Sequence, residues 1–169
     1  MALLFGNDDG TYKNACPICS EPLSNPVFAT SHFIADEANP LWRFSDAGMH
    51  WECYAHWPER ESFARLYFDT VTSYELTNPY WPTVLRHPDV VVRANLETMQ
   101  SLDMDIRSIG PGPRIDASDW TAFLHGDLLG DCVHDCQRSA LAAIIPIIRE
   151  ALPTIAAVRA AAKETGGEQ

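Results

Sequence analysis

The spacing of apolar residues predicts helices in three parts of the chain. In residues 58–68 the apolar positions recur at the i, i+3, i+4 spacing of a helix with one buried face, and these positions are Phe63, Leu66 and Tyr67. Residues 116–124 predict a short helix that Asp116 can cap. The alanine-rich stretch 131–164 predicts a long helical segment, within which Pro153 is expected to start a fresh helix.

Alternating apolar and polar residues predict strands between these helices. Residues 89–107 are rich in β-branched residues, and their second half alternates as a half-buried strand does, with Leu102, Met104 and Ile106 between charged side chains. We therefore expect a hairpin or a short meander in this stretch. Residues 27–34 predict a further strand, and residues 110–116 predict either a strand or a turn directly into the following helix.

These elements predict an α+β protein in which a short antiparallel β element and a C-terminal helical segment follow a cysteine-bearing lobe. Prolines punctuate residues 78–88, which predicts a connector there. We expect an N-terminal lobe at residues 1–88 and a lobe of β-hairpin plus helices at residues 89–169. A chain of 169 residues has room for both in one compact unit.

Acidic residues outnumber basic ones by 23 to 12 and give a formal net charge of -11. Such a charge repels phosphate backbones and anionic lipids, so it disfavours nucleic acid and membrane partners and favours a basic protein. The chain shows neither a run of roughly 20 apolar residues nor the basic leader of a signal peptide, so we expect a cytoplasmic protein. An odd count of five cysteines fits metal ligation better than a disulfide framework.

Two short motifs supply a set of four metal ligands. Cys16 and Cys19 flank a proline-containing knuckle, and His50 and Cys53 are three residues apart, a spacing that places them on one face of a helix starting near residue 48 or 49. Zn²⁺ in structural sites takes four such ligands. His56 is a rival to His50, because it lies three residues after Cys53.

The ligand order and spacing, Cys-x2-Cys-x30-His-x2-Cys, resemble those of treble-clef zinc modules and are similar to the first finger of LIM domains, although the middle segment is longer here. The resemblance covers about a quarter of the chain and extends to no other part of it. It implies a structural Zn²⁺ held by Cys16, Cys19, His50 and Cys53.

The same stretch contains His50-x-Glu52, which resembles half of the zinc-deaminase signature. In that family the His-x-Glu motif precedes a Pro-Cys-x-x-Cys motif, whereas here the order is reversed. A deaminase also needs an open coordination position for water, and Cys53 would occupy it. We therefore expect a closed structural site, with Glu52 pointing away from the metal.

A second group of candidate ligands lies in residues 125–136. On one continuous helix Cys132 and Cys136 would be i, i+4 neighbours, so with His125 or an aspartate they could bind a second metal or act in catalysis. The simpler interpretation is that both are core thiols, because their helix face continues with Ala140 and then Ala143 or Ile144 and free cysteines are often buried. His134 is expected to be exposed to solvent.

The charge and the closed site favour a non-catalytic binding protein that docks a basic protein partner, as immunity proteins do when they neutralise cationic toxins. A regulatory nucleic-acid binder is an alternative and would need a cluster among Arg43, Arg60 and Arg65. An enzyme that uses the cluster between His125 and Cys136 is another, and the metal content per chain distinguishes it.

Overall fold

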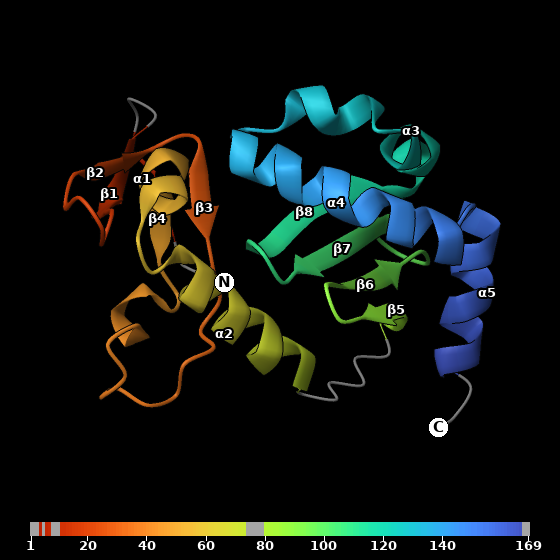
Figure 1. Cartoon of the computed structure of the whole chain (residues 1–169), viewed down its shortest axis with the longest axis horizontal. Helices are drawn as coiled ribbons and strands as arrows, with labels where there is room; N and C mark the ends of the chain where they lie inside the picture. Colours follow the sequence, from red (N-terminus) through yellow and green to blue (C-terminus); the bar gives the residue numbers. More distant parts are fainter. Residues whose placement is uncertain (1–3, 5, 8–10, 74–79, 167–169) are drawn as a thin grey trace.

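A computed structural model describes residues 4, 6–7, 11–73 and 80–166, and it shows the expected α+β protein. The N-terminal half forms small two-stranded sheets and two helices, and the C-terminal half forms a four-stranded sheet with helices around it (Figure 1). Each half has its own hydrophobic core.

The N-terminal half consists of two β-hairpin-like pairs followed by a short helix. β1 pairs antiparallel with β2, and β3 pairs antiparallel with β4. The elements are β1 (Thr11–Ala15), β2 (Pro22–Ser24), β3 (Val27–Ala29), the 3-10 helix η1 (Trp42–Phe44), β4 (Gly48–His50) and α1 (Trp51–His56). This half therefore places a strand end and a helix start directly beside the knuckle that follows β1.

Two local predictions in this half were wrong. The predicted strand at 27–34 ends at Ala29, because the following backbone leaves the ladder and the Ser45 hydroxyl accepts the N–H groups of Phe33 and Ile34 instead. The predicted helix start near residue 48 is a strand, since residues 48–50 pair with β3, and the helix begins at Trp51.

The helix predicted at 58–68 is confirmed as α2 (Arg60–Ser73). Phe63 and Tyr67 are buried as expected, and each ring meets Phe33 edge to face with centroids 5.1 Å apart. Leu66 is only partly buried. Aromatic contacts of this kind add about 0.5–1.5 kcal/mol each beyond the burial of area.

The predicted meander is confirmed and is longer than the sequence indicated. Four antiparallel strands follow one another in the order β5 (Thr83–His87), β6 (Val90–Asn95), β7 (Ser101–Ile106) and β8 (Gly110–Asp116). Residues 110–116 thus form a strand, the first of their two predicted forms. The predicted connector at 78–88 contains β5, and its residues 78–79 lie outside the described residues. The expected boundary after residue 88 falls between β5 and β6, which pair in one sheet.

Helices pack on both faces of this sheet. Val92, Leu102 and Met104 belong to the core that also contains Ile144 and Ile148 of α4. The predicted C-terminal helices are η2 (Ala117–Asp119), α3 (Trp120–His125), η3 (Asp127–Asp131), α4 (Asp135–Ala151) and α5 (Ile155–Gly166). As predicted, a fresh helix starts just after Pro153, and α5 is bent by 74° relative to α4.

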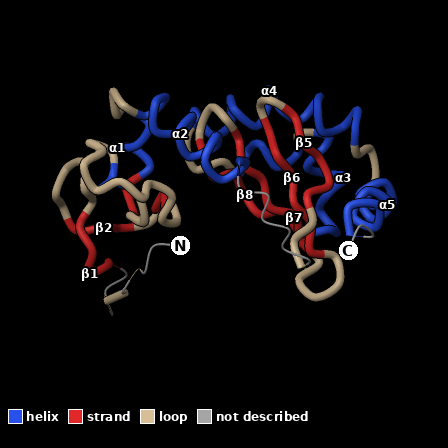
Figure 2. Tube along the Cα trace, turned by 90° about the horizontal axis from the view of Figure 1, so that it is seen from below, coloured by secondary structure: helices blue, strands red, loops and turns tan. Residues whose placement is uncertain are grey.

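The opposite face of the sheet meets α2, which lies between the N-terminal hairpins and the sheet (Figure 2). The hydroxyl of Tyr67 donates to Asp105 Oδ1 on β7 at 3.1 Å, and Arg93 on β6 pairs with the same carboxylate. The hydroxyl of Tyr54 donates to the carbonyl oxygen of Ile109 at 2.8 Å. The sheet therefore holds the N-terminal half through buried polar contacts as well as apolar ones.

Within the described part of the chain, no single helix has the length and apolar character needed to cross a membrane. The α4–α5 pair passes that test only when its two helices are taken together, across their 74° bend.

Candidate metal centre

The four predicted ligands converge in the N-terminal half. The ligand atoms of Cys16, Cys19, His50 and Cys53 all lie within 4.8 Å of one another. Cys16 directly follows β1, and Cys19 belongs to the turn that leads to β2. The knuckle is closed by two backbone hydrogen bonds: the N–H of Cys16 donates to Glu21 O at 2.9 Å, and the N–H of Ser20 donates to Cys16 O at 2.8 Å. Both sulfurs are thereby carried on one tight turn.

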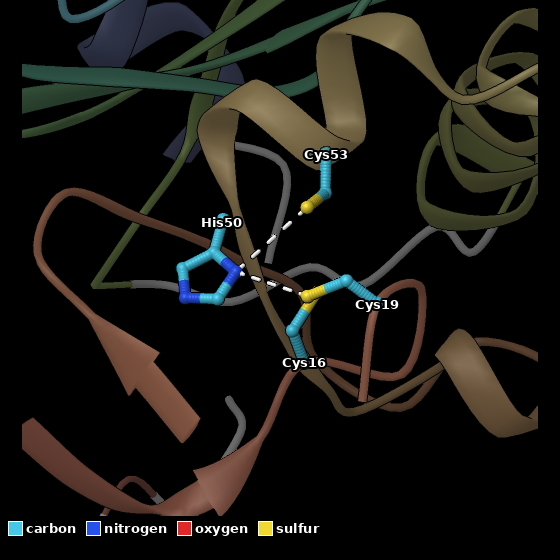
Figure 3. A group of neighbouring side chains, drawn as sticks. All are labelled: Cys16, Cys19, His50 and Cys53. Carbon is cyan, nitrogen blue, oxygen red and sulfur yellow. Dashed lines mark hydrogen bonds between the residues drawn. The ribbon is translucent and has the colours of Figure 1, made fainter. Parts of the chain in front are cut away.

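The other two ligands come from the junction of β4 and α1. His50 is the last residue of β4 and the cap residue of α1, and Cys53 lies in the first turn of that helix. Figure 3 shows Nδ1 of the imidazole directed at two sulfurs, Cys19 Sγ at 3.5 Å and Cys53 Sγ at 3.8 Å. A tetrahedral Zn²⁺ with bonds of about 2.3 Å to sulfur and 2.0 Å to nitrogen separates those ligand atoms by about 3.5 Å. The observed distances match this spacing.

The far side of the His50 ring is also held in place. Its Nε2 lies 3.2 Å from the carbonyl oxygen of Pro22 and 3.3 Å from the N–H of Ser24. When Nδ1 offers its lone pair to a metal, Nε2 carries the proton and can donate to Pro22 O, which is the usual way that a protein orients a ligating histidine. Nε2 could accept the N–H of Ser24 only in the other tautomer, in which Nδ1 carries the proton.

Their surroundings shift the pKa values of Cys16 and Cys53 in opposite directions. Burial raises the pKa of Cys16, but the N–H groups of Cys19, His50 and Ile18 donate to its sulfur and together hold that pKa below its ordinary value. Burial, followed by the neighbouring sulfurs of Cys19 and Cys16, raises the pKa of Cys53 to about 12. Adding a third thiolate beside two others is unfavourable unless a cation joins them.

Glu52 and His56 take no part in this group. Glu52 instead lies 3.3 Å from Nδ1 of His56 and 3.4 Å from Nε2 of His134, which lies at the start of α4. His56 therefore does not replace His50 beside the cysteines. The deaminase interpretation fails on the same geometry, because the carboxylate it needs for proton transfer faces away from the sulfurs.

The group of Glu52, His56 and His134 was not anticipated from the sequence. His134 was expected to be exposed, but its side chain is only 20% exposed, and its Nδ1 accepts the N–H of Cys136 at 3.2 Å as the N-cap of α4. The three side chains therefore link α1 of one half to α4 of the other. Histidine is not among the preferred N-cap residues, so this contact could not be predicted from residue preference.

The paired arrangement of Cys132 and Cys136 that a second metal site would need is not formed, and both thiols pack on the cores instead. Cys132 precedes α4, which begins at Asp135, so Cys132 and Cys136 are not neighbours on one helix. Cys132 packs against the C-terminal core and Cys136 against the N-terminal core, and both are partly buried and free. Among the described residues neither joins a group of three metal-ligand atoms.

Comparison with known proteins adds no family to this geometry. No protein-family model matches the chain, and no curated protein or solved structure matches it either.

Proposed function

We propose that Cys16, Cys19, His50 and Cys53 hold a structural Zn²⁺ in a module of the treble-clef type. The order of a cysteine knuckle, a β-hairpin and a helix that supplies the last ligand supports this proposal, and so do the distances among the four ligand atoms. Three thiolates and one neutral imidazole complete a tetrahedral shell and leave no position for a substrate. The ion therefore contributes folding free energy rather than catalysis.

The module belongs, in this proposal, to a binding protein that docks a basic protein partner. The observation that carries the proposal is an acidic segment, residues 116–135, which contains no lysine or arginine. All five of its aspartates are exposed: Asp116, Asp119, Asp127, Asp131 and Asp135. Only the last of them has an ion-pair partner among the described residues, Arg138. Asp116 interacts electrostatically with Arg114, and the carboxylates of Asp119, Asp127 and Asp131 remain available to cations of a partner.

The acidic segment also borders an apolar hollow. A cavity of about 170 Å³ opens beside Asp131 and is lined by apolar side chains that include Phe123, Leu128 and Leu141. Val133, at its edge, is 47% exposed. Interfaces commonly combine such an apolar anchor point with a charged rim. This combination suits a partner that presents one apolar side chain among lysines and arginines.

Charge complementarity of this kind mainly accelerates association and fixes the orientation of the two proteins. An immunity protein that neutralises a cationic toxin has these requirements, because it must capture its partner quickly. We propose this role as the specific form of the binding function. A gene for a basic toxin beside the gene for this chain is the expected genomic arrangement.

The experiment compares two triple variants that lose the same charge. One is Asp119→Asn/Asp127→Asn/Asp131→Asn in the acidic segment, and the control is Glu21→Gln/Glu37→Gln/Glu59→Gln in the N-terminal half, where all three side chains are exposed. Partners from the native cytosol are captured with the zinc-loaded protein, identified, and purified for association kinetics at low and high salt.

The proposal expects a basic partner whose association rate falls by about tenfold or more in the aspartate variant and at high salt. The glutamate variant should associate nearly as fast as the wild type. An acidic partner, or a basic one that associates equally fast with both variants, would refute the assignment of this segment.

A further inference from the structure

A second hollow lies where the two halves of the protein meet. It has a volume of about 670 Å³ and opens between α2, α4 and the turn that joins β7 to β8. This size falls within the range of about 300–1,000 Å³ typical of small-molecule sites, which often occur between two structural units. The hollow is called the interlobe cleft below. It contains none of the candidate zinc ligands and no aspartate of the acidic segment.

The interlobe cleft is lined by more basic than acidic side chains, in a protein whose formal net charge is -11. Three arginines line it, Arg60, Arg65 and Arg107, together with the two acidic residues Glu61 and Asp89. Arg43, the third member of the predicted nucleic-acid cluster, does not line it.

The three arginines differ in their existing partners. Arg107 already forms a two-point ion pair with Asp69, at 2.8 and 3.5 Å, and Arg60 lies 3.8 Å from Glu61. Arg65 is exposed and has no hydrogen-bond or ion-pair partner among the described residues. One cation of the cleft is therefore free to meet an anion without breaking an existing pair.

The wall of the cleft that α4 forms is mainly apolar. Ala143 and Ile147 are its accessible apolar side chains, Ala140 and Ile144 lie buried behind them, and Ser139 adds a hydroxyl. A ligand seated there would contact hydrocarbon with its body and a guanidinium with its head group. Polyanions such as nucleic acid fit less well, because Glu61 and Asp89 on the rim would repel their further charges.

We propose that the interlobe cleft binds a small organic monoanion with an apolar or aromatic body, and that Arg65 receives its carboxylate. This ligand-binding activity is independent of the proposed docking of a basic protein. Arg65 is suited to the role because a guanidinium binds a carboxylate through two parallel hydrogen bonds. Cys136, which is partly buried, also lines the cleft, so the reactivity of its thiol can report on occupancy.

The test uses the zinc-loaded full chain and 2-naphthoate as the probe, with uncharged 2-naphthamide as its matched control. Calorimetric titration is expected to show naphthoate binding about tenfold or more tightly than the amide. Arg65→Gln should remove most of this preference, and Arg65→Glu should abolish it. Arg159→Glu, which reverses a cation of another cavity beside Tyr80 and Lys163, should leave naphthoate binding unchanged.

A second readout locates the probe. Alkylation of Cys136 by iodoacetamide, followed by peptide mass mapping, should slow by about fivefold when naphthoate is saturating, because the bound anion covers the thiol. Cys132, which lines a different cavity, should react at an unchanged rate. The proposal is overturned if naphthoate and naphthamide bind alike, if Arg159→Glu weakens binding more than Arg65→Glu does, or if Cys136 is not protected.

Discussion

The buried Asp105 carboxylate offers a sharp test of how the two halves are joined. Its side chain is 9% exposed, and it accepts a hydrogen bond from Tyr67. It also forms an ion pair with Arg93, whose side chain is 22% exposed. Tyr67→Phe removes one donor to a buried carboxylate, which costs about 1.5–3 kcal/mol. Asp105→Ala leaves the Tyr67 hydroxyl and the Arg93 guanidinium without their shared partner. Breaking a buried ion pair in this way costs about 3–5 kcal/mol, and we expect the lower end because Arg93 keeps some contact with water.

Urea unfolding of the zinc-loaded protein measures both free energies, and the double variant measures their coupling. Because Tyr67→Phe and Asp105→Ala delete the same contact, the double variant should cost little more than Asp105→Ala alone. Asp103→Ala is the matched control on the same strand: Asp103 pairs with Arg114, but their side chains are 35% and 47% exposed. Its cost should stay below about 1 kcal/mol. Additive single effects, or an Asp105→Ala cost as small as the control's, would refute the reasoning.

Three further predictions concern stability and metal binding. Gly48→Ala should lower the free energy of unfolding, measured in urea, by about 1–3 kcal/mol, because the new Cβ would lie 2.8 Å from Leu23 Cδ1. Burial raises the pKa of Tyr54 and of Tyr67. The stability that these two neutral phenols contribute is therefore complete below about pH 10 and is lost at higher pH, where the same tyrosines ionise in the unfolded chain. Urea midpoints at neutral and alkaline pH measure this loss. Cys53→Ser should cut the zinc content of the purified protein and unfold the N-terminal half, as metal analysis and near-ultraviolet circular dichroism would show.

Each of these predictions has its own control. Gly130→Ala tests the substitution where a Cβ would meet nothing within 4 Å, so an equal loss at Gly48 and Gly130 would contradict the packing argument. Tyr67→Phe should lose less stability than the wild type at alkaline pH, and an identical loss would contradict the assignment to Tyr67. Cys132→Ser should leave the zinc content unchanged, since Cys132 lies outside the ligand group.

The sequence predicted that Cys16, Cys19, His50 and Cys53 come together, because the spacing within each motif is local chemistry. A Cys-x-x-Cys knuckle and a His-x-x-Cys turn each bring two donors together whatever the rest of the chain does. The start of α1 was not predictable in the same way, because residues 48–50 form a strand by pairing with β3 and the helix begins only at Trp51. His50 therefore reaches the cysteines from the end of a strand rather than from a helix face.

The parts that the sequence did not predict depend on distant partners. The alternating pattern in β7 predicts that Asp105 faces solvent. It is buried instead, because Tyr67 of α2 and Arg93 of β6 both contact its carboxylate. β5 was not predicted because Pro82 and Pro88 flank it, and closely spaced prolines are typical of a connector. His134 likewise acquires its role only through Glu52, which lies in the other half of the protein.

Zinc-edge X-ray absorption on the purified protein tests the closed metal centre most directly. About one Zn²⁺ per chain is expected, bound by three sulfurs near 2.3 Å and one nitrogen near 2.0 Å. An oxygen ligand, fewer than three sulfurs, or a correctly folded protein that binds no metal would contradict this expectation.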